Sequence, residues 1–220
     1  MPRSSKGGLA AALLLFALPL FAAQPYHLQL EANPAAPFPF LGKFGTVTID
    51  VYPGGVRAET LLMNGFSRNG TSTITVENPL TRIASNEPIA EIAPALQKLG
   101  RVDVDASSVP PRAPEVRGKV GSIDATRYRL MYGPTAWIDV WTTTAIPPNP
   151  QFRAIVDQFV AGIAPGTAAA LRSIPGTPLY VELNFRRYKK LPLLRLKSFA
   201  PNSEGEEQAL KVGRLYFFAP

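Results

Sequence analysis

KVGSIDATRYRLMYGPTAWIDVWTTTAIPPNPQFRAIVDQFVAGI, residues 119–163, is the stretch that decides the fold. Side chains alternate from Arg127 to Tyr132, which predicts a strand with Tyr128, Leu130 and Tyr132 on one face and the arginines on the other. Gly133-Pro134 has the chemistry of a turn. The run from Ala136 to Trp141 is rich in β-branched and aromatic residues, so it predicts a second strand.

A helix is predicted after this pair of strands. Asn149 can cap its first turn, and Pro150 suits the first helical position. The apolar residues then recur at helical spacing and form one wide stripe: Phe152, Ile155, Val156, Phe159, Val160 and Ile163. We therefore expect an amphipathic helix that lies across a β-sheet.

The rest of the chain predicts more strands of the same sheet. In Thr46–Tyr52 the residues Val47, Ile49 and Val51 should point inward, and Asp50 and Tyr52 outward. Further strands are expected at residues 26–31, 56–63, 72–76, 179–186, 193–199 and 212–218. Short helical pieces are expected at residues 86–99, where Pro94 interrupts the pattern, and at 167–171, while residues 101–117 and 202–207 read as loops.

Composition favours a packed, cysteine-free protein. Hydrophobic residues make up 46% of the chain and charged residues 18%, which excludes wholesale disorder. The absence of cysteine excludes disulfides, thiol nucleophiles and a lipid anchor attached through a cysteine. The formal net charge of +7 includes Arg3 and Lys6 and comes with no long basic tract, so it reads as solvated surface charge.

Residues 1–23 have the three parts of a secretory signal peptide. Arg3 and Lys6 form the positive start, residues 9–21 the apolar centre, and Ala22-Ala23 the small-residue exit. We expect cleavage after Ala23, which would leave residues 24–220 as a single domain in the periplasm or outside the cell. The alternative is an uncleaved anchor, although the run is short for a membrane span. We expect no integral membrane segment after signal removal.

Three motifs resemble a known family. They are GSIDATRY (121–128), a strand leading into a tyrosine; WTTTAIP (141–147), a tryptophan-bearing strand that runs to Ile-Pro; and GTPL (176–179), the entry to the next strand. Together they resemble the LolA/LolB-type lipoprotein-carrier superfamily, and within it a family of uncharacterised exported bacterial domains. The resemblance covers the second half of the chain well and the first half only by strand order.

The resemblance implies a fold. It is α+β, with a strongly bent antiparallel sheet, or half-open β-barrel, and helices covering the concave face. The matching residues are structural and form no catalytic signature. The chain also departs from the lipid-anchored carriers, because it has no cysteine to modify.

Few residues point to covalent chemistry. The single histidine, His27, reads as a strand-edge residue, and Asp103-x-Asp105 reads as a solvated loop as readily as a cation site. Asp139 between Trp137 and Trp141 is a pattern that suits sugar binding, but aromatic residues filling the interface between sheet and helix explain it as well. We therefore expect no enzyme, metal, cofactor or nucleic-acid partner, and a hydrolase or carbohydrate-active protein ranks last.

Binding of an apolar ligand is the function we expect. A bent sheet under helices encloses either a cavity or a filled core, and both fit this sequence. The expected walls and lid are Val47, Ile49, Val51, Tyr128, Leu130, Val181, Leu183, Phe185, Phe152, Ile155 and Phe159. The basic turn Arg186, Arg187, Lys189 and Lys190 could contact anionic headgroups. The expected partner is a lipid or an apolar small molecule; the alternative is a structural envelope module, with a filled core, that binds a protein partner.

Overall fold

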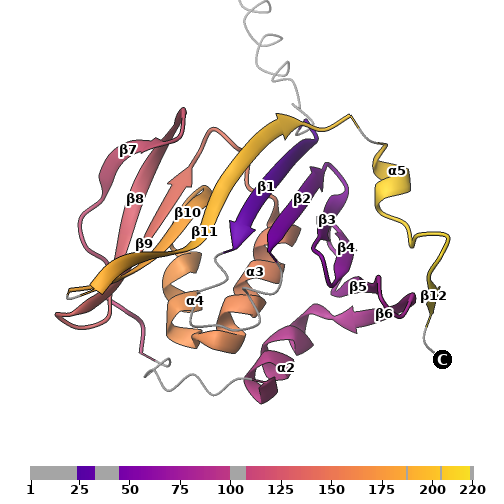
Figure 1. Ribbon diagram of the computed structural model, residues 1–220, viewed down its shortest axis with the longest axis horizontal. Helices are drawn as coiled ribbons and strands as arrows, with labels where there is room; N and C mark the ends of the chain where they lie inside the picture. Colours follow the sequence, from indigo (N-terminus) through magenta and orange to yellow (C-terminus); the bar gives the residue numbers. More distant parts are fainter. Residues whose placement is uncertain (1–23, 33–44, 100–107, 187, 204, 219–220) are drawn as a thin grey trace, which may run out of the picture.

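A computed structural model describes residues 24–32, 45–99, 108–186, 188–203 and 205–218, and these form one large sheet with several helices (Figure 1). The predicted signal peptide and Asp103-x-Asp105 lie outside the described residues. The strands are β1 (Tyr26–Ala32), β2 (Thr46–Tyr52), β3 (Gly55–Glu59), β4 (Asn64–Arg68), β5 (Thr73–Asn78), β6 (Ile83–Pro88), β7 (Val116–Val120), β8 (Ile123–Met131), β9 (Ala136–Thr143), β10 (Thr177–Phe185), β11 (Tyr188–Pro201) and β12 (Phe217–Phe218). The helices are the 3-10 turn η1 (Ile89–Glu91), α2 (Ile92–Leu99), α3 (Pro150–Ile163), α4 (Pro165–Arg172) and α5 (Glu206–Ala209).

The twelve described strands form one open, mixed sheet in the order β12-β6-β5-β4-β3-β2-β1-β11-β10-β9-β8-β7. Neighbouring strands are antiparallel except β12, which runs parallel to β6. The expected α+β class is confirmed, and the sheet is mixed rather than wholly antiparallel. β1 lies between β2 and β11, so His27 is in the middle of the sheet and not at its edge.

The strand predictions hold where side chains alternate and fail where turn residues occur within strands. β2 has the predicted bounds, and β8, β9 and β10 match closely. The strand predicted at residues 56–63 ends earlier, since β3 stops at Glu59. Asn64 and Gly65 begin β4, which was not predicted, and Gly65 pairs there with Ala58. β6 was also missed, and it takes up the beginning of the segment predicted as helical. The predicted strand 212–218 is reduced to β12.

α3 forms as its sequence predicts. The Asn149 side chain accepts a hydrogen bond from the Phe152 backbone N–H at 2.9 Å, and Pro150 lies in the first turn. α3 ends at Ile163, and α4 begins at Pro165, two residues before the helical piece predicted at residues 167–171. α2 packs closely on the end of α3, since a Cβ on Gly162 would lie 2.7 Å from the Leu96 Cβ. Only glycine fits at this crossing.

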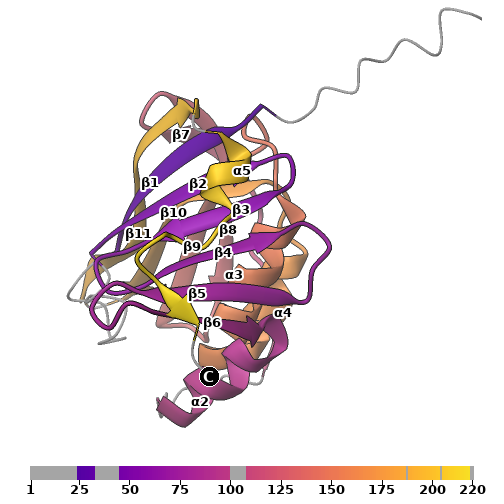
Figure 2. The ribbon, with the colours of Figure 1, turned by 90° about the vertical axis from the view of Figure 1, so that its right-hand side faces the viewer.

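The two faces of strands β2–β4 carry different elements. Val51 and Val56 belong to a buried cluster against which Phe152 and Ile155 of α3 pack. On the opposite face, Tyr52 and Phe66 form a second cluster with Ala209 of α5 and Leu210 just after it. Figure 2 shows α5 in front of these strands and α3 behind them. Tyr52 does point away from α3, as predicted, but it is only 1% exposed because the C-terminal segment covers that face.

Candidate functional site

The predicted binding residues fall into two apolar clusters. The first, here the sheet–α3 cluster, has nine buried members: Tyr26, Leu28, Leu30, Ile49, Val51, Val56, Ala125, Ile146 and Leu179. Val47 and the helix residues Phe152 and Ile155 are half-buried and pack against it. Five of the predicted residues, from β2 and α3, therefore meet as the sequence implied.

The second cluster, here the sheet–α4 cluster, comprises the buried residues Tyr128, Leu130, Val140, Ala170 and Ile174. The predicted wall residues Tyr128 and Leu130 thus meet residues of α4 and of the turn after it rather than α3, and Val181 packs beside them. Tyr132 donates or accepts a hydrogen bond with Thr167 of α4. Burial raises the pKa of Tyr132 to about 12, so its hydroxyl stays neutral at ordinary pH.

The other predicted site residues lie outside these clusters. Leu183 and Phe159 are half-buried, and Phe185 is exposed at the end of β10. In the basic turn between β10 and β11, Arg186 and Lys190 are exposed to solvent. Arg187 and the side chain of Lys189 lie outside the described residues. The structure therefore groups the β2, β8 and α3 residues in buried clusters and leaves the end of β10 at the surface.

Polar side chains anchor the first turn of α3. The Gln151 amide donates to Ser67 Oγ at 2.7 Å and to the Thr71 carbonyl at 3.0 Å, and its oxygen accepts from the Gly70 N–H at 3.2 Å. Arg153 donates to the carbonyls of Leu171 and Ile174 at 2.7 and 2.8 Å. Neither residue was among the predicted site residues, although polar residues beside a capped helix start are a usable signal.

Beyond that first turn, α3 packs through side chains that stay partly exposed. Its apolar stripe includes Phe152, Ile155, Val156, Phe159 and Val160, and all five are half-buried. The residues beneath Phe152 and Ile155 in the sheet–α3 cluster are buried almost completely. The helix therefore lies over buried apolar residues while its own apolar stripe stays partly exposed to solvent. This boundary is the candidate binding site.

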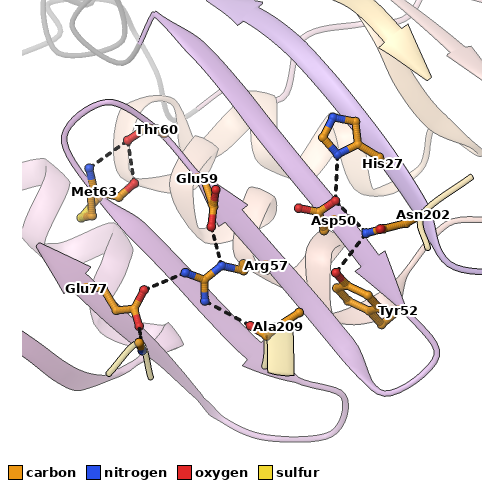
Figure 3. A network of polar contacts seen from close by, with 11 residues as sticks. His27, Asp50, Tyr52, Arg57, Glu59, Thr60, Met63, Glu77, Asn202 and Ala209 are labelled. Atoms are coloured by element: carbon orange, nitrogen blue, oxygen red, sulfur yellow. Dashed lines mark hydrogen bonds and ion pairs between the residues drawn. The ribbon is translucent and has the colours of Figure 1, made fainter. Parts of the chain in front are cut away.

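The opposite face of the sheet carries a network of charged side chains around the buried carboxylate of Glu77 (Figure 3). Arg57 donates to Glu59 at 2.6 Å, to Glu77 at 2.8 Å and to the Ala209 carbonyl at 3.1 Å. Burial acts to lower the pKa of Arg57, but the two carboxylates outweigh it and raise that pKa. Glu77 also accepts from the Gly213 N–H at 2.7 Å. The network fixes the C-terminal segment on the sheet.

His27 belongs to a second group on the same face (Figure 3). Its Nδ1 lies 2.8 Å from Asp50 Oδ1, and Asn202 donates to the same oxygen at 2.8 Å and to the Tyr52 hydroxyl at 3.0 Å. These contacts join β1 and β2 to the C-terminal segment. A histidine and an aspartate are held together here, and the groups around them are an amide and a phenol, so the arrangement is that of a structural polar network.

Asp139 is buried between the strands β8, β9 and β10. Arg129 donates to both of its carboxylate oxygens, at 2.7 and 2.8 Å, and lies over the Trp137 ring at 4.8 Å. Trp137 shares its strand face with Asp139, whereas Val140 meets α4 on the other face. The interpretation that both tryptophans fill the interface between sheet and helix is thus wrong for Trp137.

Glu182 lies directly opposite Asp139 on β10 and is also buried. Tyr180 donates to it at 2.6 Å. Burial, and then this hydrogen bond, raise the pKa of Tyr180 to about 12. The Arg129–Asp139 pair and the Tyr180–Glu182 bond give each buried carboxylate a donor, which accounts for both residues as parts of the sheet.

Within the described residues, no three His, Asp or Glu side chains gather as a metal-binding group. In the same part of the chain, every helix is too short or too polar to cross a bilayer. The fold and the site together define an α+β protein with a large open sheet and an apolar helix–sheet boundary.

Comparisons with known proteins do not assign a function to this α+β protein. No family model matches the chain, and no curated protein matches it. One similar solved structure is described as an uncharacterized conserved protein from Thermus thermophilus, with a TM-score of 0.47 and 12% identity over 90% of each chain. At these values the similarity carries no argument about function, so the function is argued from the site itself.

Proposed function

We propose that this protein is a non-catalytic carrier or binding protein for a lipid or another apolar ligand. In this proposal the sheet is a half-open barrel, α3 and α4 cover its concave face, and the ligand lies between α3 and the sheet–α3 cluster. The protein would act in the periplasm or outside the cell after removal of residues 1–23. The resemblance to the LolA/LolB-type carriers motivates the same reading.

One observation carries the proposal: the apolar stripe of α3 is half-buried although it lies over fully buried sheet residues. A helix that completes a core normally buries such a stripe. Phe152 and Ile155 thus retain apolar surface that a ligand chain can cover. Each methylene group that leaves water there contributes about 0.8 kcal/mol.

The anchoring of α3 is consistent with this mechanism. Gln151 and Arg153 hold the first turn through hydrogen bonds, and Gly162 fixes the last turn against Leu96. Beyond the first turn, Ile155 meets the sheet–α3 cluster as a half-buried apolar side chain. A ligand chain can separate these side chains from the sheet without breaking the anchors, and exposed cations such as Arg186 and Lys190 can meet an anionic headgroup.

A pair of tryptophan variants on α3 tests the proposal. Ile155→Trp fills the boundary, and Ala154→Trp places the same ring on the exposed side of the helix. We expect Ile155→Trp to weaken fluorescent fatty-acid binding at least tenfold and Ala154→Trp to leave it unchanged. Native mass spectrometry of the exported protein should show bound lipid in the wild type and in Ala154→Trp.

The stability of the same variants distinguishes a binding protein from an envelope module with a filled core. In a filled core, Ile155→Trp overpacks the interior and destabilises the fold by about 1–3 kcal/mol. In a ligand site, the free energy of unfolding changes by less than this. A destabilised Ile155→Trp, together with no bound lipid and no fatty-acid uptake in the wild type, would refute the carrier proposal.

A further inference from the structure

Exposed apolar side chains gather at one corner of the sheet, far from α3. Five of the eleven large apolar residues exposed in the described chain belong to residues 80–83 and 215–218. They are Leu80 at 77% exposed, Ile83 at 46%, Leu215 at 64%, Phe217 at 72% and Phe218 at 56%. We call residues 78–83 and 214–218 the β12 tip; it forms the right-hand end of the molecule in Figure 1. Scattered apolar residues are ordinary, but a gathering of this size marks an interaction surface.

Strand pairing and hydrogen bonds hold the β12 tip in a defined conformation. Phe217 lies beside Ile83 in the parallel β12–β6 pair, and its N–H donates to the Arg82 carbonyl at 3.0 Å. The Asn78 side chain accepts from the N–H groups of Leu80 and Thr81 at 2.9 and 3.2 Å, which fixes the turn. Arg82 has a positive φ of 57°, a conformation that arginine rarely adopts and that persists only where the surroundings impose it.

The buried network described above holds both parts of the tip in place. Glu77, which binds Arg57, directly precedes Asn78 and the turn. The same carboxylate accepts from Gly213, directly before Arg214 and the second part of the tip. The five apolar side chains are therefore presented to solvent from a rigid base.

The charge of the tip indicates what it contacts. Arg82 and Arg214 flank the apolar residues, and neither forms an ion pair with any other described residue. Residues 78–84 and 208–218 contain no acidic side chain. Guanidinium groups bind phosphate in a bidentate manner, and phenylalanine and leucine insert at the boundary between headgroups and acyl chains.

We propose that the β12 tip docks the protein on an anionic phospholipid bilayer, with Phe217, Phe218 and Leu80 inserted and Arg82 and Arg214 on the phosphates. A second copy of the chain fits less well, because a symmetric contact would bring the unpaired arginines together. In addition, β12 has only two residues, so its edge offers little backbone for pairing with another strand. This inference goes beyond the proposed carrier function and does not depend on it.

Hydrogen-exchange mass spectrometry of the full chain tests the contact locally, so that binding by the N-terminal residues does not obscure it. We expect vesicles of mixed phosphatidylglycerol and phosphatidylcholine to slow exchange at residues 80–84 and 214–218. Vesicles of phosphatidylcholine alone should slow it far less, and added salt should reduce the effect. Equal protection by both kinds of vesicle would overturn the role of charge.

Variants separate the apolar and charged contributions. Phe217→Ser with Phe218→Ser should lower vesicle affinity at least tenfold. Arg82→Asn, which tolerates the positive φ, and Arg214→Gln should each lower it about fivefold. Leu61→Ser is the matched control, because Leu61 is similarly exposed in the turn between β3 and β4, and its affinity should not change.

Two outcomes would refute membrane docking. One is a loss of affinity in Leu61→Ser as large as in the phenylalanine variant. The other is protection of the tip that rises with protein concentration in the absence of vesicles, which would assign the tip to self-association. Fatty-acid binding should be unchanged in all tip variants, so the carrier proposal and the docking proposal succeed or fail separately.

Discussion

The two faces of strands β2–β4 hold their covering segments in different ways. α3 meets one face through half-buried apolar side chains such as Phe152 and Ile155, and hydrogen bonds anchor its first turn. The C-terminal segment meets the other face through a buried leucine, Leu210, and through charges with complete sets of partners around Arg57 and Glu77. Directional, buried contacts fix a segment in one position, whereas partly exposed apolar contacts can be exchanged for those of a ligand.

The largest expected effect comes from breaking the charged network. Glu77→Ala removes a completely buried carboxylate and leaves Glu59 as the only carboxylate that binds the Arg57 guanidinium, so we expect a loss of about 3–5 kcal/mol in the free energy of unfolding. Urea denaturation measures this loss. Glu59→Ala is the control, because its exposed side chain should contribute at most about 1 kcal/mol. Equal losses of unfolding free energy in the two variants would show that Glu77 is not the main stabilising partner of Arg57.

Truncation on each face gives the next largest difference. Leu210→Ala removes a buried side chain and should cost about 2–5 kcal/mol. Phe152→Ala removes a half-buried ring and should cost only about 1–2 kcal/mol. Thermal and urea unfolding of both variants measure the contrast. A loss for Phe152→Ala that matches or exceeds that of Leu210→Ala would show that α3 completes a filled core.

A smaller effect is expected at the N-cap of α3. Asn149→Ala removes the acceptor for the Phe152 N–H and should cost about 1 kcal/mol. Asn149→Ser keeps an acceptor at this position and should retain most of the stability. If serine and alanine destabilise the protein equally, the hydrogen bond to Phe152 is not what stabilises the helix start.

The smallest effect concerns alkaline pH. Burial raises the pKa of Tyr26 to about 12, so the folded state favours the neutral phenol, which donates to the Pro147 carbonyl at 2.8 Å. This contribution is complete below the ordinary tyrosine pKa of about 10 and is lost as the pH rises towards 12. The stability advantage of the wild type over Tyr26→Phe should therefore narrow between about pH 10 and about pH 12. Urea denaturation of both proteins measures this advantage. An advantage that stays constant across that pH range would show that the Tyr26 hydroxyl does not contribute to stability in this way.

Regular sequence patterns predicted that α3 covers one face of strands β2–β4. No such pattern predicted that the C-terminal segment covers the other face. Helix α3 was predicted from Asn149, Pro150 and the apolar stripe that begins at Phe152. The bounds of β2 were predicted from the alternation of its side chains. The sequence analysis did not identify the roles of Arg57 and Glu77, because Arg57 and Glu77 are 20 residues apart and the Ala209 carbonyl that Arg57 binds is 152 residues away. Large apolar residues such as Tyr52 and Phe66 on the outer face were the available signal that a second layer covers it.

The sequence predicted part of the candidate site, namely the contact between β2 and α3. Ile49, Val51, Phe152 and Ile155 meet because helix and strand periodicities place them on facing surfaces. Tyr128 and Leu130 meet residues of α4 and of the turn after it. α3 ends at Ile163, directly before Pro165, and Pro165 and Gly166 also begin α4, two residues ahead of the helical piece predicted at residues 167–171. Proline is compatible with the first turn of a helix as well as with a stop, so the local sequence did not decide between them. The anchors supplied by Gln151 depend on Ser67 and Thr71, which no local pattern connects to α3.

The central position of β1 has a consequence for how the chain reaches its native state. Tyr26 pairs with Val51 on one side and with Pro201 on the other, so the first strand becomes fully paired only when nearly the whole polypeptide is present. Contacts between such distant residues slow folding and delay it until synthesis is almost complete. A newly made chain therefore remains without its complete sheet for longer than a chain built from local hairpins.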